Sequence, residues 1–412
     1  MAKRRVVVTG VGLVSPLGND LDTVTAGLAA GRSGVQYMDN WGEYEGVETR
    51  LGAPAAPWAI SGFTRKQLRT MGPVARMATC ATQAAIADAG LDPDFVRSGD
   101  VGLSYGSTDG SCSAEEGYYR KLYATNSFVG LLASSYLKFM SHTCAANLAQ
   151  LFGITGRVVP ICSACTSASQ SIGQGYESIA YGMEDTMICG GAEELHFTVA
   201  GVFDLMLATS VGYHDRPTAT PRPFDRDRDG MVVGEGAGTL VLEEYERAKA
   251  RGAHIHAELV GYGTNCDGGH LTSPSDTGMA GAMRRSLKDA GLSPADIGYI
   301  NAHGTGTEVG DLAESRATHA VLGDSVPVSS TKSNTGHTLG GCGAIESIFV
   351  FGLMRDGFLP PTRTLENPDP RCAPLDHIMG DPREGTPEFV MNNNFAFGGI
   401  NTSLIFRRPD RI

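Results

Sequence analysis

The 412-residue sequence has few charged side chains, no surplus of positive charge and no long apolar run. Charged residues make up 19%, against roughly 25% in an average soluble chain. With 42% hydrophobic residues the chain can build a large core, so intrinsic disorder is excluded and a subunit interface is favoured. No stretch approaches the ~18 consecutive apolar residues of a membrane-spanning helix, so we expect no membrane segment.

Positive charge is in deficit, because 33 Lys and Arg residues face 45 Asp and Glu residues, for a net charge of −12. Proteins that bind nucleic acid need a positive footprint, so we expect no nucleic-acid partner. An acidic protein partner would need a local basic patch. Arg65, Lys66 and Arg69 form the one such candidate that we single out, and a solvated basic edge is the alternative interpretation.

The cysteine pattern does not match a disulfide framework. Nine cysteines, an odd number, are scattered from Cys80 to Cys372, which favours a reducing, cytoplasmic setting. Cys162 and Cys165 form C-x-x-C, but the sequence has no second such pair for a zinc site. The basic start followed by VVVTGVGLV imitates a signal peptide, yet its glycines interrupt the apolar stretch, so we interpret it as a first strand.

Glycine is abundant, with 54 residues, and strand-like runs alternate with helical patterns along the chain. This alternation is typical of an α/β fold with tight turns. The runs are VVV at 6–8, VGLSY at 101–105, VVPI at 158–161, VPVS at 326–329 and FVMNN at 389–393.

The sequence repeats itself. The segment around Asp88 (AIADAGLDPDFVRSGDVGLSYGSTDG) recurs around Asp289 (SLKDAGLSPADIGYINAHGTG), and VPICSAC at 159–165 recurs as VPVSSTK at 326–332. The two offsets differ, which predicts an insertion of the first half around 111–145. We therefore predict two halves, 1–250 and 251–412, with a site at their shared face. The second match places Cys165 and Lys332 at equivalent positions.

Three side chains could carry chemistry at that face. Cys165 follows a strand-like run and precedes a helical pattern, so the helix N-terminus would favour its thiolate, the form that attacks acyl groups. An inert buried thiol is the alternative. His303 and His337 lie in glycine-rich loops after strands, where α/β proteins place ligands. Each alone would be interpreted as an ordinary loop histidine, but the repeat brings both towards Cys165.

Two other motifs are weaker. Gly10-Val-Gly12-Leu-Val-Ser15 lacks the third glycine of a dinucleotide-binding turn and is followed by Pro16. The segment starting at Asp225 opens like a calcium loop, but its twelfth position is Gly236 instead of glutamate. We expect neither ligand and interpret the second motif as structural.

Taken together, the motifs resemble the β-ketoacyl-acyl-carrier-protein synthases, condensing enzymes of the thiolase superfamily, and most closely their type II elongating branch. The matching stretches span the chain in the family's order: RRVVVTGVGLVSPLGN, CSACTSASQSIG, GGAEE, RPFDRDRDGMVVGEGAGTLVLEE, HGTGT, STKSNTGHTLGGCGAIESI and NNFAFGGINTSLIF. The resemblance implies a thiolase-like fold, with duplicated α/β halves in a layered αβαβα body.

The resemblance also implies catalytic roles. Cys165 would accept the acyl chain, and His303 and His337 would promote malonyl decarboxylation and stabilise the enolate. Backbone N–H groups of Cys165 and Phe397 would form the oxyanion hole, with Phe397 also acting as a gate. Lys332 matches the family's active-site lysine, and the supporting residues would be Glu346 and Asp311.

Substrate contacts follow from the same resemblance. Thr305 and Thr307 would hold the phosphopantetheine arm of an acyl carrier protein, which would dock at Arg65, Lys66 and Arg69. The acyl pocket would be lined by Phe395, Thr108 and Asp109. Asp109 stands where the family usually has an apolar residue, which predicts a preference away from medium and long saturated chains. No cofactor or metal is expected beyond the carried substrates.

The sequence thus predicts a cytoplasmic, dimeric acyltransferase that condenses an acyl thioester with malonyl carrier in fatty-acid biosynthesis. A ketosynthase of a specialised type II polyketide or polyene pathway is the alternative. A non-catalytic chain-length subunit is disfavoured, because such paralogues lack the nucleophile. A homodimer is expected, with a heterodimer containing a paralogous subunit as the alternative.

Overall fold

The computed structural model describes residues 3–412. Its strands are β1 (Val6–Val14), β2 (Gln36–Tyr37), β3 (Leu51–Ala53), β4 (Val101–Gly106), β5 (Val158–Ile161), β6 (Thr186–Glu193), β7 (Val233–Gly234), β8 (Gly236–Glu244), β9 (Ala257–Cys266), β10 (Ile297–Asn301), β11 (Pro327–Ser329), β12 (Phe358–Leu359), β13 (Asp376–His377), β14 (Arg383–Glu384), β15 (Phe389–Phe395) and β16 (Ile400–Arg407). Four of the five strand-like runs named from the sequence lie wholly in these strands, the fifth (326–329) begins one residue before β11, and VVVTGVGLV is β1.

The helices separate most of these strands, as the alternating pattern predicted. They are α1 (Leu21–Ala29), α2 (Pro73–Asp88), α3 (Pro93–Val96), α4 (Cys112–Thr125), α5 (Ala133–Phe139), α6 (Thr143–Phe152), α7 (Ser167–Ala180), α8 (Phe197–Leu205), α9 (Tyr245–Ala250), α10 (Asp276–Ala290), α11 (Glu308–Leu322), α12 (Lys332–Thr335) and α13 (Cys342–Asp356). Among residues 3–412, no helix is both long and apolar enough to cross a membrane.

The main sheet shows the duplication directly. Its strand order is β13-β11-β10-β15-β16-β9-β1-β8-β6-β4-β5, so the sequence β11-β10-β15-β16-β9 is mirrored by β5-β4-β6-β8-β1. Both halves combine parallel outer pairs with antiparallel inner pairs. The halves join where Val6–Val8 of β1 pairs with Ala257–Leu259 of β9.

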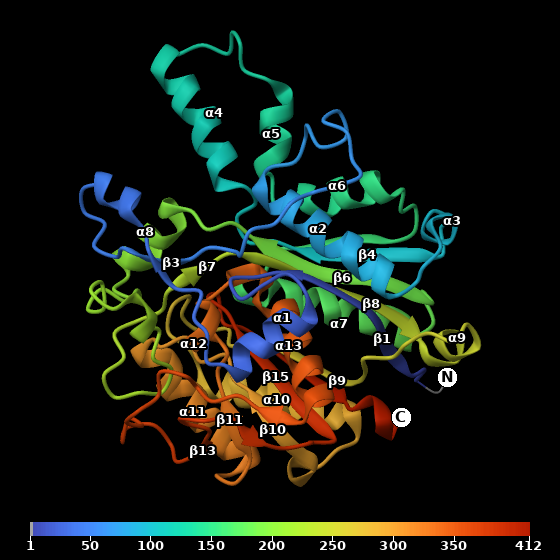
Figure 1. Ribbon diagram of the computed structural model, residues 1–412, viewed down its shortest axis with the longest axis vertical. Coiled ribbons are helices and arrows are strands. Elements are labelled where there is room, and N and C mark those ends of the chain that lie inside the picture. Colours follow the sequence, from blue (N-terminus) through green and yellow to red (C-terminus); the bar gives the residue numbers. More distant parts are fainter. Residues whose placement is uncertain (1–2) are drawn as a thin grey trace.

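The helices lie in three layers around this sheet. Helices α7 and α13 contact strands of both halves and lie between them, while α2 and α6 cover one outer face and α10 and α11 the other (Figure 1). Helix α13 is buried along almost its whole length, as its apolar sequence requires. This is the layered αβαβα body that the sequence predicted.

Glycines at matched places let the outer helices approach the strands. A Cβ atom at Gly10 or Gly12 of β1 would lie 2.3 or 2.1 Å from a backbone oxygen of α2. Gly261 and Gly263 of β9 meet α10 in the same way, at 2.4 and 2.1 Å. The glycines of the GVG motif therefore serve helix–strand packing.

The calcium-like segment is likewise structural. The Asp225 carboxylate accepts hydrogen bonds from the backbone N–H groups of Asp227, Glu366 and Asn367, and it pairs with Arg222 at 3.2 Å. These donors hold the C-terminal segment that follows α13 against the loop before β7. The prediction of a structural role for this segment is confirmed.

The predicted insertion contains the hairpin of α4 and α5, which projects from the body (Figure 1). The corresponding β10–β11 connection contains only α11 as a long helix. Helix α9 ends at Ala250, the boundary predicted between the halves, and β9 starts the second half.

Candidate active site

Cys165 lies in a single 3-10 turn, Ala164–Thr166, between β5 and α7. Ala164 adopts a left-handed φ of 49°, which is strained for a residue with a Cβ and aims the next side chain away from the helix. The second half contains the same kind of turn: Leu339 has a left-handed φ of 45° in the turn Leu339–Gly341 before α13. The residue equivalent to Cys165 is therefore Gly340.

This geometry corrects the sequence match of Cys165 with Lys332. Both residues follow equivalent strands, β5 and β11, but the second half has the extra helix α12 between its strand and its long buried helix. Lys332 begins α12, ten residues before α13. Sequence alignment without gaps could not reveal this short insertion.

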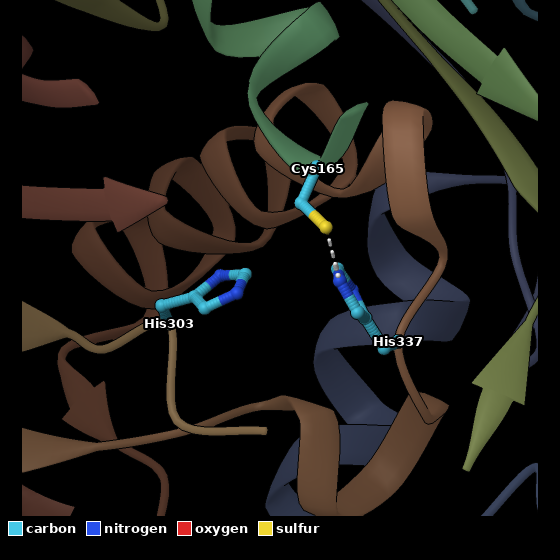
Figure 2. A group of neighbouring side chains, drawn as sticks. All are labelled: Cys165, His303 and His337. Atoms are coloured by element: carbon cyan, nitrogen blue, oxygen red, sulfur yellow. Dashed lines mark hydrogen bonds between the residues drawn. The ribbon is translucent and has the colours of Figure 1, made fainter. Parts of the chain in front are cut away.

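The three predicted catalytic side chains meet in one place, although they come from three separate loops. Cys165 Sγ lies 2.9 Å from His337 Nε2, and the rings of His303 and His337 are edge-to-face with centroids 5.0 Å apart (Figure 2). One ligand-capable atom of each residue lies within 4.8 Å of the others, a spacing that three metal ligands could also adopt. The expectation of no metal therefore stays a prediction.

Burial dominates the charge state of the nucleophile. It raises the pKa of the Cys165 thiol to about 12, against the opposing effects of Lys332 and of the backbone N–H groups of Cys165 and Phe397. Burial therefore opposes the thiolate that the helix terminus was predicted to favour, and Cys165 rests as a thiol. The groups that oppose the rise thus include both predicted oxyanion-hole donors.

Both histidines are neutral. Burial and then the charge of Lys332 hold the pKa of His337 well below its usual value. The same two causes, with His337 added, lower the pKa of His303. A neutral imidazole can accept the thiol proton at one nitrogen and donate an N–H to a developing oxyanion.

Lys332 supplies the positive charge that adds to burial in lowering the pKa of both histidines. It is fully buried and forms an ion pair with Glu346, as predicted. Burial alone would lower the pKa of Lys332, but Glu346 raises it above its usual value by charge and hydrogen bonding. Asn394 Nδ2 donates to the other oxygen of Glu346 at 2.8 Å, which fixes the carboxylate.

Two acids on α11 shape the loop that carries His303. The Glu314 carboxylate accepts the backbone N–H groups of His303 and Gly304 at 2.8 and 2.6 Å. Asp311, predicted as supporting, accepts from Gly306 N at 3.2 Å and from Phe224 N at 2.7 Å. Sequence reasoning missed Glu314, although its spacing of three from Asp311 places both acids on one helix face.

A cavity of about 470 Å³ opens onto Cys165 and both histidines. Thr305 and Thr307 line it, with their hydroxyl oxygens 3.0 Å apart, and so do Phe395 and Phe397. The Phe397 ring lies 5.4 Å from that of Phe203, centroid to centroid. The structure thus places the predicted pantetheine and gate residues at the reaction centre.

Thr108 and Asp109 are not part of the lining of this cavity. Their backbone N–H groups donate to the buried Glu193 at 2.8 and 3.2 Å, and Gly340 N does so at 3.1 Å. Sequence reasoning also missed Glu193. The Asp109 side chain is exposed in the single chain, so its place in an acyl pocket stays a prediction.

The remaining predicted residues are on the surface. Arg65, Lys66 and Arg69 are exposed on the loop between β3 and α2, and the cavity lining does not include them. Cys162 is an exposed free thiol whose Sγ lies 3.4 Å from the Thr108 carbonyl oxygen. All nine cysteines are free, so the C-x-x-C motif forms no disulfide here.

A buried thiol at a strained turn, bonded to a neutral imidazole and faced by two backbone N–H groups, defines an acyl-transferring thiol enzyme on a duplicated α/β fold. The family models Beta-ketoacyl synthase, N-terminal domain, and Beta-ketoacyl synthase, C-terminal domain, match residues 3–248 and 256–366. The chain belongs to the β-ketoacyl synthase family.

Similar proteins agree over the full length. 3-Oxoacyl-(acyl-carrier-protein) synthase 2 of Vibrio cholerae is 38% identical over 99% of this chain and 100% of its own. The crystal structure of a β-ketoacyl synthase from Burkholderia phymatum is 49% identical, covers 98% of this chain and 99% of its own, and has a TM-score of 0.95. A type II polyketide-synthase ketosynthase in complex with its acyl-carrier protein, AntDE:AntF, is 31% identical over 98% and 99% of the two chains, with a TM-score of 0.89.

Proposed function

We propose that this protein is a β-ketoacyl-acyl-carrier-protein synthase that lengthens an acyl chain by two carbons in fatty-acid biosynthesis. The observation that carries the proposal is the contact of 2.9 Å between Cys165 Sγ and the neutral His337, with His303 beside it. The substrates would be an acyl thioester and a malonyl thioester, each on the phosphopantetheine of a carrier protein.

The first half-reaction transfers the acyl chain to Cys165. His337 Nε2 accepts the thiol proton as the sulfur attacks the thioester carbonyl, because the thiol pKa is too high for a resting thiolate. The backbone N–H groups of Cys165 and Phe397 stabilise the tetrahedral oxyanion. The carbon–sulfur bond to pantetheine then breaks, and the departing thiolate takes the proton back.

The second half-reaction forms the carbon–carbon bond. The malonyl thioester loses CO2, and the electron pair of the broken C–C bond remains on the rest of the thioester as an enolate. The enolate oxygen accepts hydrogen bonds from N–H groups of His303 and His337. The enolate carbon attacks the acyl carbonyl on Cys165, and the bond to Cys165 Sγ breaks. The released Cys165 thiolate then takes up one proton from water, which balances the loss of the malonyl carboxylate as CO2 and restores the starting thiol. Neutral histidines suit this step, since an imidazolium would quench the carbanion.

We further propose that the protein forms a homodimer. The edge strand β5 is half exposed, with Val158 39% accessible, and the α4–α5 hairpin exposes Tyr123, Phe128 and Val129 to 71%, 73% and 87%. An unpaired strand edge and exposed apolar side chains are both suited to contact with a second copy of the chain. A paralogous subunit could occupy the same surface.

A specialised polyketide pathway is the second candidate. Its support is the full-length likeness to the AntDE:AntF ketosynthase and the presence of Asp109 near the nucleophile turn. The higher identity to a 3-oxoacyl carrier synthase favours fatty-acid elongation. A non-catalytic subunit is disfavoured because Cys165 and its partners are intact. The cytoplasmic location stays a prediction.

Acylation of Cys165 tests the proposal. Incubation with acyl carriers should add the acyl mass to the peptide that contains Cys165, and malonyl carrier should then release a product two carbons longer. Cys165→Ala should lower condensation by at least 10³-fold, because Cys165 is the only thiol among the described residues that line the cavity, while slow malonyl decarboxylation survives on the two histidines. Cys162→Ala is the matched control and should retain activity. Condensation at near-normal rates by Cys165→Ala would refute the mechanism.

A further inference from the structure

The catalytic cluster consists of three side chains of the kind that bind transition metals. The ligand-capable atoms of Cys165, His303 and His337 all lie within 4.8 Å of one another, and all three residues are buried. No other group of three cysteine, histidine or carboxylate side chains among the described residues meets this spacing. The reaction uses these atoms for proton transfer and hydrogen bonding, but their arrangement also suits a metal ion.

The spacing fits a tetrahedral zinc site after small movements of the side chains. With Zn–S and Zn–N bonds of about 2.3 and 2.0–2.1 Å, the ligand atoms of such a site lie about 3.3–3.6 Å apart. Cys165 Sγ and His337 Nε2 are 2.9 Å apart, so they need to separate by about 0.6 Å. His303 points into the space beside them (Figure 2), and its approach by at most about 1.5 Å completes the set.

The types of ligand select the ion. One thiolate and two imidazoles suit Zn²⁺, whereas Mg²⁺ and Ca²⁺ prefer carboxylate, carbonyl and water oxygens. Three protein ligands leave the fourth position of a tetrahedral ion to water. The cavity of about 470 Å³ reaches all three side chains, so an ion can enter and a water molecule can complete its coordination.

Two features of the surroundings make such binding reversible. Nδ1 of both histidines is buried without a hydrogen-bond partner in the described part of the chain, whereas the histidines of zinc sites usually donate that N–H to a carboxylate or carbonyl. The nearby positive charge of Lys332 also opposes a cation, although its ion pair with Glu346 offsets part of that charge. The site is therefore suited to an inhibitor that exchanges, and not to a resident cofactor.

We propose that Zn²⁺ binds reversibly to Cys165, His303 and His337 of the resting enzyme and blocks its acylation. Binding forms a Zn–S bond, releases the thiol proton to water and occupies the imidazole nitrogen that would otherwise accept this proton. Acylation excludes the ion in turn, because the thiolate is the metal ligand and a thioester sulfur carries no negative charge. Metal and acyl chain therefore compete for one sulfur, a consequence that rests on the proposed function.

Cobalt tests the site without reference to the reaction. Co²⁺ should give the wild-type protein a thiolate-to-metal absorption band that saturates at one ion per active site, and Zn²⁺ should displace it. Cys165→Ala should abolish the band. His303→Ala should lower the affinity for the ion by at least about tenfold, since loss of even a second-shell partner costs ~10–100-fold.

Two exposed thiols provide the matched controls. Cys162→Ala and Cys266→Ala remove them and should leave the band unchanged. The unaltered chain, once acylated on Cys165, should also lack the band, which gives a comparison that no folding defect can affect. A band that persists in Cys165→Ala or in the acylated protein, or that disappears with either control, would place the ion elsewhere and overturn the proposal.

Kinetics complete the test. Zn²⁺ should raise the apparent KM for acyl carrier and leave kcat unchanged at saturating acyl carrier, a chelator should reverse the effect, and the same concentration of Mg²⁺ should have none. Equal inhibition by Mg²⁺, a fall in kcat alone, or no inhibition when free Zn²⁺ exceeds the enzyme concentration would overturn the proposal. Failure of the metal-free enzyme to acylate Cys165 would instead count against the proposed function, and the Co²⁺ band would still decide the metal site.

Discussion

Burial of Cys165 sets the chemical problem that its neighbours solve. The thiol pKa of about 12 means that the nucleophile rests as a thiol, so a proton acceptor must be in contact with it. His337 is that acceptor, and it stays neutral because it is buried near the protonated Lys332. The lysine is in turn kept charged by Glu346. Glu346, Lys332 and His337 thus act in series, because each of them influences the charge of the next residue towards Cys165.

Glu314 offers a test of these electrostatics at the residue scale. Burial raises its pKa to about 8, well above the ~4.3 of an unfolded chain. Between these values the folded state holds one proton more than the unfolded state, so the free energy of unfolding falls as the pH rises. From pH 7 to 8 the expected loss is about 1 kcal/mol, and Glu314→Gln should remove it.

Denaturant unfolding at several pH values measures this slope. Glu308→Gln, an exposed carboxylate on the same helix, is the matched control and should keep the wild-type slope. The histidines do not interfere in this window, because their lowered pKa values leave them neutral in the folded state and the unfolded state is also largely neutral above pH 7. Identical slopes in Glu314→Gln and the wild type would contradict the assignment.

At the scale of elements, the loop after β4 is fastened to the nucleophile region by one buried carboxylate. Glu193, at the end of β6, accepts hydrogen bonds from the backbone N–H groups of Thr108, Asp109 and Gly340. Because Gly340 belongs to the second half, these bonds join the two halves. Burial raises the pKa of Glu193 to about 7, and Asp109 adds to the rise. The position of Asp109 therefore depends on the hydrogen bond from its backbone N–H to Glu193, a residue far away in the sequence.

Asp109→Ile should shift acyl preference towards saturated chains of 8 to 14 carbons, by about tenfold in relative kcat/KM. An ionised carboxylate beside a hydrocarbon tail lacks a partner, and an isoleucine would remove that cost. Turnover of a chain-length series on carriers measures the change. Asp109→Asn keeps the polarity without the charge and should give an intermediate preference. A wild-type enzyme that already prefers these saturated chains would refute the idea.

At the scale of the whole molecule, the two edges of the main sheet differ. Strand β5 ends the eleven-stranded order on the side of the first half, whereas β13 extends the other edge. The projecting α4–α5 hairpin has no counterpart in the second half (Figure 1). The asymmetry between two otherwise matched halves supports a dimer through β5.

Val158→Lys should weaken that dimer, because a two-fold interface brings the new charge in twice. We expect at least a tenfold rise in the dissociation constant, equivalent to about 1.4 kcal/mol, by sedimentation equilibrium. Met379→Lys is the control, because Met379 is an exposed apolar residue that follows β13, at the opposite end of the sheet from β5. A wild-type protein that is monomeric alone and dimeric only with a paralogous subunit would replace the homodimer by the heterodimer.

Much of this protein is determined by local sequence. The alternation of strand-like and helical segments, the DAGL helix ends at Gly90 and Gly291, and the strand-to-helix turn at Cys165 depend on neighbours in the chain. They could therefore be predicted from periodicity and turn chemistry. The GVG segment of β1 and the GYG segment of β9 also indicate the duplication, because each strand needs glycines where an outer helix packs closely on it.

Other features were decided only by the tertiary structure. The thiol pKa of Cys165 depends on burial by segments far away in sequence, so the sequence suggested the wrong charge state. Glu193 and Glu314 act through backbone groups that only folding brings to them. The match of Cys165 with Gly340 likewise depends on backbone angles and on distant packing, which composition and spacing do not encode.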